Sequence, residues 1–262
     1  MTNPLVQATA LYHAGRYAEA EAEARSVAAA PRTKPEDEVF GPLALGIAGL
    51  AVSAQGRHAE AVSIFDALLP VFDGLVGAEH PLTLKLRSDR AHALSALGRY
   101  AECEAECAAV AQLAARNTGP EVPLIVVHAR TGQIQALIAL GRHEEAEALS
   151  RQNLAAHCEP DQATLILRLG LARSLNCQGR HVEALAEAER ADEVRRDWPE
   201  EHRRPETGAV ELAAAIALLG LGRGTEARLL AAAARDDCLA AFGPDNSRTI
   251  EAQVLLDRID GA

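Results

Sequence analysis

The side chains best suited to metal binding or redox chemistry in this sequence are those of its five cysteines. Cys103 and Cys107 are four residues apart, so on a helix they would share one face and could share a metal ion or a redox bond. No Cys-x-x-Cys or His-x-x-His pair completes such a site. We therefore interpret the cysteines as reduced thiols in small core or surface positions, and we expect no metal and no cofactor.

Motifs for catalysis or nucleotide binding do not occur in the sequence. It contains no G-x-x-x-x-G-K-[ST] loop, no strand-embedded G-x-G-x-x-G, no G-x-S-x-G and no H-E-x-x-H. Serine and histidine residues are present, but no spacing selects a catalytic triad from them. The sequence therefore disfavours an enzyme.

Composition and charge exclude other classes of partner. The 262 residues include 26 basic and 37 acidic ones, a net charge of −11, whereas nucleic-acid-binding proteins usually present a basic face. The longest apolar run, near residues 212–222, is about half of the roughly 20 residues that a membrane span needs. The first ten residues lack a basic stretch followed by an apolar one, so we expect a cytoplasmic protein with no nucleic-acid or membrane partner.

A Gly-Arg dipeptide recurs six times, at spacings of 38 to 43 residues. Each glycine is followed four residues later by a glutamate and then by a small residue. The six glycines are Gly15, Gly56, Gly98, Gly141, Gly179 and Gly222. So regular a recurrence indicates a repeat protein rather than a conventional globular domain.

Each repeated glycine separates two segments with helical composition, such as residues 82–97 and 101–116 on either side of Gly98. A glycine ends a helix readily because it adopts positive φ, and the short turn makes the two helices antiparallel. Proline-containing links then return the chain to the next pair. The sequence predicts an all-α single domain over residues 1–262, with about six helix pairs and a final capping helix near residues 247–259.

Two links share a further pattern: Gly77-Ala78-Glu79-His80-Pro81-Leu82-Thr83-Leu84 and, more loosely, residues 242–250. With the Gly-Arg corners, these links resemble the tetratricopeptide repeat family. They resemble above all the extended repeats of kinesin light chains and many bacterial regulators, which are longer than the usual 34 or so residues. The resemblance covers almost the whole chain. It implies a right-handed superhelical solenoid whose first helices line a concave groove.

The resemblance also implies which side chains face that groove, counted back from each corner glycine. In the third to fifth pairs the polar ones are Lys85, Ser88, His92, His128, Thr131, Gln135, Arg173 and Asn176. The ionisable groups in this set are basic or neutral, whereas acidic residues concentrate on the second helices. A groove of this character would favour an anionic peptide segment or the C-terminus of a partner chain.

Three functions remain open at this point. The first is a non-catalytic scaffold or adaptor that binds a protein or peptide in the groove. The second is a regulatory sensor that responds to a short peptide and acts through a partner protein. The third is an enzyme or small-molecule binder that uses the polar centre of the groove, with His92, His128 and Arg173 as its acid–base and anion-binding groups.

Overall fold

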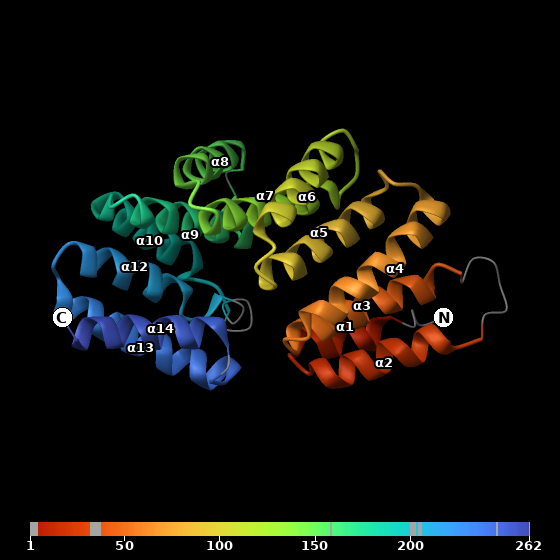
Figure 1. Ribbon diagram of the computed structural model, residues 1–262, viewed down its shortest axis with the longest axis horizontal. Coiled ribbons are helices and arrows are strands. Elements are labelled where there is room, and N and C mark those ends of the chain that lie inside the picture. The colour runs from red at the N-terminus through yellow and green to blue at the C-terminus, as the bar shows by residue number, and fades with distance from the viewer. Residues whose placement is uncertain are drawn as a thin grey trace. The chain divides into compact units, whose positions relative to one another are not determined.

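The computed structural model describes residues 5–31, 38–157, 159–199, 203, 206–244 and 246–261. Over these ranges the chain forms thirteen α-helices and no strand, as the all-α prediction requires (Figure 1). The helices are α1 (Val6–His13), α2 (Tyr17–Ala29), α3 (Phe40–Ala54), α4 (His58–Val76), α5 (Pro81–Ala96), α6 (Tyr100–Ala114), α7 (Val122–Ala139), α8 (His143–Ala156), α9 (Gln162–Cys177), α10 (His181–Arg195), α12 (Ala209–Gly220), α13 (Gly224–Phe242) and α14 (Ser247–Asp260).

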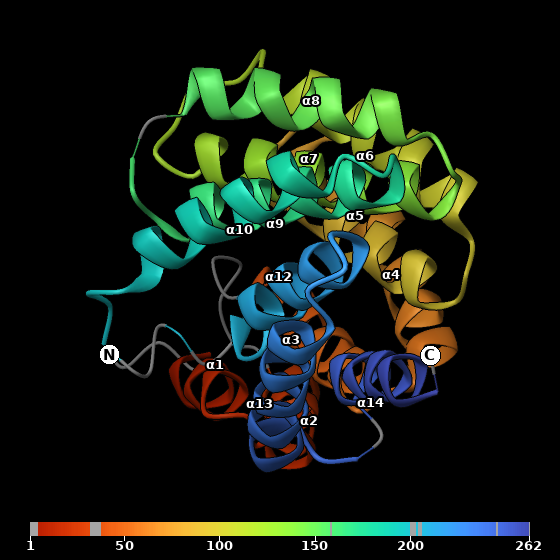
Figure 2. The same cartoon turned by 90° about the vertical axis from the view of Figure 1, so that its left-hand side faces the viewer.

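The helices are grouped in two compact units, Met1–Ala136 and Leu137–Ala262, and the division falls within α7. The first unit contains the pairs α1/α2, α3/α4 and α5/α6 with most of α7, and the second contains α8 to α14. In the second unit α13 and α14 pack side by side, so the final helix covers the last pair as predicted (Figures 1 and 2). A single domain over residues 1–262, and the handedness of a superhelix, stay predictions.

The six corner glycines do end helices, which confirms the repeat pattern. Their φ angles lie between 74° and 81°, in the left-handed region that glycine adopts at little cost. At the third corner, the backbone N–H of Arg99 donates to the carbonyl of Leu94 at 3.0 Å and the N–H of Gly98 donates to Ser95 at 2.9 Å. These bonds satisfy carbonyl groups that the end of the helix would leave open. Each first helix therefore reverses directly into its second helix.

The arginine and glutamate of the repeated pattern form an ion pair at every corner. At the third corner two nitrogens of the Arg99 guanidinium bond Glu102, Nε to Oε1 and Nη2 to Oε2, each at 2.7 Å. The equivalent pairs are Arg16–Glu19, Arg57–Glu60, Arg142–Glu145, Arg180–Glu183 and Arg223–Glu226. The carboxylate lies in the first turn of the second helix, where the helix dipole also stabilises it. This accounts for a glutamate that the sequence pattern alone left unexplained.

Small residues allow the helices to approach closely. The small residue after each corner glutamate is fully buried; these six are Ala20, Ala61, Cys103, Ala146, Ala184 and Ala227. On α3 a Cβ at Gly49 would lie 2.7 Å from the ring of Phe65 on α4, so this contact requires glycine. The core is therefore built from alanine and aliphatic side chains in thin layers between successive helices.

Helix α7 corrects one expectation. Its 18 residues are long and apolar enough to span a membrane by length and composition. It is therefore longer than the segment 212–222, which the sequence analysis gave as the longest apolar run. However, 44% of its residues are buried within the protein, including Ile125 and Ala129 in a core cluster with α5 and α6. We interpret α7 as the core helix of a repeat.

Candidate functional site

A pocket of about 700 Å³ opens in the first unit. Its lining comes from α1, α3, α5 and α7, the first helices of four successive pairs, and from the link before α5. Within this unit the first helices therefore do share an inner surface, as the resemblance implies. Three of the eight site residues expected from the sequence, Lys85, Ser88 and His128, lie in the pocket wall.

The walls of the pocket are largely apolar. Ile47 and Leu50 on α3 face it from one side, and Leu124 and Ile125 on α7 face it from the other. Leu124 is 69% exposed, so a molecule bound in the pocket could cover it. An exposed leucine at the edge of an apolar hollow is a typical feature of a surface that buries another molecule.

Lys85 is bound to a neighbour that the sequence analysis did not include. Its Nζ lies 2.6 Å from Oδ2 of Asp89, one turn further along α5, and Asp89 also lines the pocket. The side chain of Asp89 is only 7% exposed, whereas that of Lys85 is 53% exposed. The i to i+4 spacing of a lysine and an aspartate could have revealed this pair, but Asp89 was not among the counted groove positions.

Ser88, His92 and His128 form one cluster between α5 and α7. The rings of His92 and His128 stack with centroids 4.2 Å apart, and Oγ of Ser88 lies 3.0 Å from Nδ1 of His128. Nε2 of His92 donates to the carbonyl of His128 at 3.3 Å. Desolvation lowers the pKa of His128, and the nearby His92 and Lys85 lower it further. Both imidazoles therefore favour the neutral form, because desolvation lowers the pKa of His92 as well.

The other residues expected in the fourth pair, Thr131 and Gln135, do not line the pocket. Thr131 is buried, and its hydroxyl donates to the carbonyl of Val127 in the preceding turn at 2.9 Å. Gln135 is exposed on α7. Their predicted binding role stays a prediction.

Arg173 and Asn176 lie in the second unit and have partners there. Nη2 of Arg173 on α9 lies 2.5 Å from Oε1 of Glu251 on α14. Asn176 is buried; its Nδ2 donates to the carbonyl of Ala213 at 3.1 Å, and its Oδ1 lies 3.1 Å from Nδ1 of His181. Both polar atoms of this amide therefore serve packing between helices.

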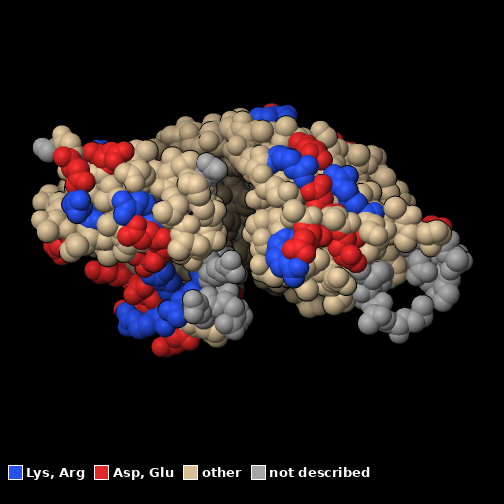
Figure 3. Space-filling view, turned by 90° about the horizontal axis from the view of Figure 1, so that it is seen from below, with Lys and Arg blue, Asp and Glu red and all other residues tan. Residues whose placement is uncertain are grey.

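The expected excess of positive charge in the groove is not present at these residues. Lys85 is paired with Asp89 and Arg173 with Glu251, so each cation is offset by an acid within the same unit. Basic and acidic side chains also lie next to each other over the surface that Figure 3 displays. The charge argument for an anionic partner is therefore weakened.

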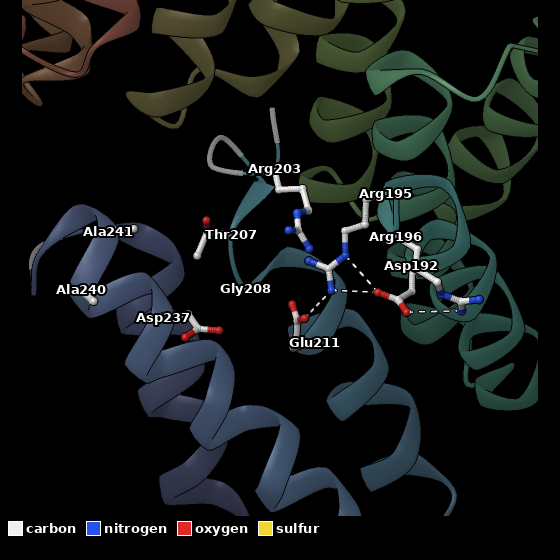
Figure 4. A pocket seen from close by; sticks show the side chains of 10 residues that line it. All are labelled: Asp192, Arg195, Arg196, Arg203, Thr207, Gly208, Glu211, Asp237, Ala240 and Ala241. Atoms are coloured by element: carbon white, nitrogen blue, oxygen red, sulfur yellow. Dashed lines mark hydrogen bonds and ion pairs between the residues drawn. The ribbon is translucent and has the colours of Figure 1, made fainter. Parts of the chain in front are cut away.

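A second pocket, of about 890 Å³, lies in the second unit between α10, α12 and α13 (Figure 4). Nε of Arg195 donates to Asp192 at 3.0 Å, and its guanidinium also bonds Glu211. Nη2 of Arg196 lies 3.8 Å from Asp192. The pocket lining holds three arginines and three carboxylates, with Arg203 and Asp237 as the remaining members. Its charges balance, so the lining favours neither an anionic nor a cationic ligand.

The two cysteines that share a face of α6 lie in the protein core. The Sγ atoms of Cys103 and Cys107 are 4.0 Å apart, both residues are fully buried, and both are free thiols. The hydrogen bond with Cys103 and then burial raise the pKa of the Cys107 thiol. Over the described residues, no group of three or more His, Cys, Asp or Glu side chains is placed to hold a metal ion, and Cys158 lies outside that range.

Comparisons with known proteins agree with this geometry. A tetratricopeptide repeat model matches residues 5–26, 85–114, 127–152 and 165–190. A crystal structure of nearly identical TPR-like repeats, assigned to a kinesin light chain of Podosopora anserina, is 22% identical, with a TM-score of 0.56 over 76% of this chain and 95% of that one. The crystal structure of BtubC (BKLC) from P. vanneervenii is 15% identical, with a TM-score of 0.63 over 87% and 91% of the two chains.

No curated protein matches the sequence. The repeat model matches α-helical pairs in both units, and the two structural relatives share their arrangement of helices. The four matched segments thus resemble tetratricopeptide repeats, and the chain has the fold of kinesin-light-chain-like repeats.

Proposed function

We propose that this chain is a non-catalytic scaffold and that the pocket of the first unit binds a segment of a partner protein. The repeat fold supports a protein-interaction role in general. The observation that carries the finer proposal is the open pocket of about 700 Å³ that four successive first helices line with apolar side chains. It lies within the size range of about 300–1,000 Å³ typical of ligand pockets.

The pocket walls offer a bound segment mainly apolar surface and few reactive groups. Leu124, Ile47 and Leu50 offer apolar surface, and covering an exposed leucine stabilises a complex by about 1.5–3 kcal/mol before the costs of association. The revised charge balance favours a segment that is mainly apolar over the anionic one expected from the sequence. A free signal peptide, as in the sensor alternative, would use the same surface.

The contact between Ser88 and His128 is the one feature that favours the enzymatic alternative, because it joins a nucleophile type to a base. However, Ser88 is fully buried, and it lies in the middle of α5, where backbone N–H groups are already bonded within the helix. Such a site has no backbone donors free to stabilise an oxyanion. The contact therefore serves packing between α5 and α7 in this proposal.

The test is a selection of peptides that bind the full chain, followed by measurement of affinity for two matched variants. Leu124→Glu places a charge in the pocket, whereas Leu229→Glu alters a leucine of nearly equal exposure, 66%, on α13. We expect Leu124→Glu to weaken binding of the selected peptides at least about tenfold and Leu229→Glu to leave it unchanged. Equal affinities for both variants, or no saturable peptide, would contradict the proposal.

A further inference from the structure

The Lys85–Asp89 pair is the polar feature that distinguishes one wall of this pocket. Oδ2 of Asp89 bonds Nζ of Lys85 at 2.6 Å, and both residues line the pocket. The side chain of Asp89 is more than nine-tenths buried, and a carboxylate can accept about four hydrogen bonds, so the single bond to Lys85 leaves it able to accept more. The pocket wall therefore contains a carboxylate that can accept a hydrogen bond from a bound group.

Next to that acceptor the wall offers a donor. A lysine ammonium carries three N–H groups, and only one is needed for the bond of 2.6 Å to Asp89. The side chain of Lys85 is half exposed, so the remaining N–H groups are accessible from the pocket. Tyr12 lies in the same lining, and desolvation, with Tyr17 and Asp89, raises the pKa of its phenol to about 12, so its hydroxyl stays neutral.

Adjacent opposite charges discriminate against a charged ligand. A carboxylate that approached Lys85 would also approach Asp89, and an ammonium that approached Asp89 would meet Lys85. Attraction and repulsion at similar distances nearly cancel, and the ligand still loses its hydration. An amide has no such conflict, because its C=O can accept from Lys85 while its N–H donates to Asp89.

We propose that the pocket takes an internal, uncharged, apolar segment of a partner protein and holds one amide group of that segment between Lys85 and Asp89. The inference rests on the proposed function of the pocket. It departs from the C-terminal or anionic partner that the sequence favoured, because that expectation required a lysine without a neighbouring acid. The other ionisable groups of the lining are His13, His80, Glu121 and His128.

The experiment compares three peptide arrays against the full chain and its variants. Each peptide is acetylated and amidated at its ends and apolar throughout, with Asn, Asp or Lys at its centre. For the wild-type chain we expect peptides centred on Asn to bind at least about tenfold more tightly than those centred on Asp or Lys, about 1.4 kcal/mol. We also expect a free C-terminal carboxylate to confer no gain over the amidated end.

Single-charge variants should change the preference in opposite directions. Asp89→Asn leaves Lys85 without its acid and should favour the Asp-centred peptides, whereas Lys85→Gln leaves the carboxylate unpaired and should favour the Lys-centred ones. Asp66→Asn is the matched control, because it breaks an ion pair with Arg90 on residues that do not line the pocket. Thermal melting checks folding, and Lys85→Gln, at an exposed position, carries the test if Asp89→Asn does not fold.

Two kinds of failure are distinguishable. If the wild-type chain prefers Asp- or Lys-centred peptides, or if both variants keep the wild-type order, the inference about the amide is wrong while the binding pocket stands. If neither the wild-type chain nor either variant binds any peptide saturably, the proposed function fails and this inference fails with it.

Discussion

Replacing a corner glycine with alanine should destabilise the protein, whereas the same change inside a helix should stabilise it. Gly98 has φ of +74°, and a Cβ there would meet no atom within 4 Å, so the cost comes from the backbone alone. Holding a residue other than glycine in that region costs about 1–2 kcal/mol. Gly98→Ala should therefore lower the free energy of unfolding by about that amount.

Gly74 is the matched control. It lies within α4, is exposed, and a Cβ there would also meet no atom within 4 Å. Alanine in the interior of a helix is favoured over glycine by about 0.5–1 kcal/mol. The two alanine variants should therefore differ by about 1.5–3 kcal/mol, with opposite signs relative to wild type.

Urea unfolding of the full chain, followed by circular dichroism, measures this difference. With a slope of about 1–3 kcal/mol per molar urea, the midpoints of the two variants should be separated by on the order of 1 M. Hydrogen exchange at the corner would locate the change if the two units unfold separately. Shifts of the two variants in the same direction would refute the assignment of Gly98 to a left-handed corner.

Two other changes test the ion pairs and the histidine cluster. Glu147 is buried and accepts from Arg180 at 2.7 and 2.8 Å. Glu147→Ala should lower the free energy of unfolding by about 1–3 kcal/mol, because it removes a buried carboxylate that accepts hydrogen bonds from Arg180 and Gln178. Glu145→Ala, at an exposed corner, should lower the free energy of unfolding less, because water screens that ion pair. Equal losses in urea unfolding would contradict this contrast. Desolvation lowers the pKa of His128 to about 3, so the folded state binds fewer protons than the unfolded one between about pH 6.5 and 3. Thermal stability should therefore fall as the pH drops below about 6.5, and less steeply in His128→Gln; parallel pH profiles would exclude this cause.

Most of the fold could be predicted from the sequence because the repeat spacing is marked by the corner glycines, and each of these glycines determines the turn at its own position. Positive φ at Gly98, for example, depends only on the turn itself, so the spacing of the glycines located the helix pairs directly. The final helix, expected near residues 247–259, extends over Ser247–Asp260. The role of the corner glutamates became clear only with the coordinates, because it depends on the direction of the neighbouring arginine side chain.

The candidate site was predictable only in part, because a groove position says which way a residue faces and not what it contacts. Lys85 and Ser88 on α5 do line the pocket, while their binding role stays a prediction. Arg173, however, is paired with Glu251, which lies 78 residues away in the chain. The position of Tyr12 in the pocket lining likewise depends on how α1 packs in the first unit, and no local sequence pattern specifies that packing.

The most direct test of the central claim is to observe Lys85 while a peptide binds. Only two lysines occur in the chain, Lys34 and Lys85, so incorporation of carbon-13-labelled lysine gives few side-chain signals and keeps the ammonium N–H groups, and a Lys85→Arg variant assigns the signal from the pocket. If the pocket of the first unit binds an uncharged apolar segment, the Lys85 signal should shift in a saturable way as the Asn-centred peptides are added. An unchanged Lys85 signal at saturating peptide would place binding elsewhere on the protein and contradict the account.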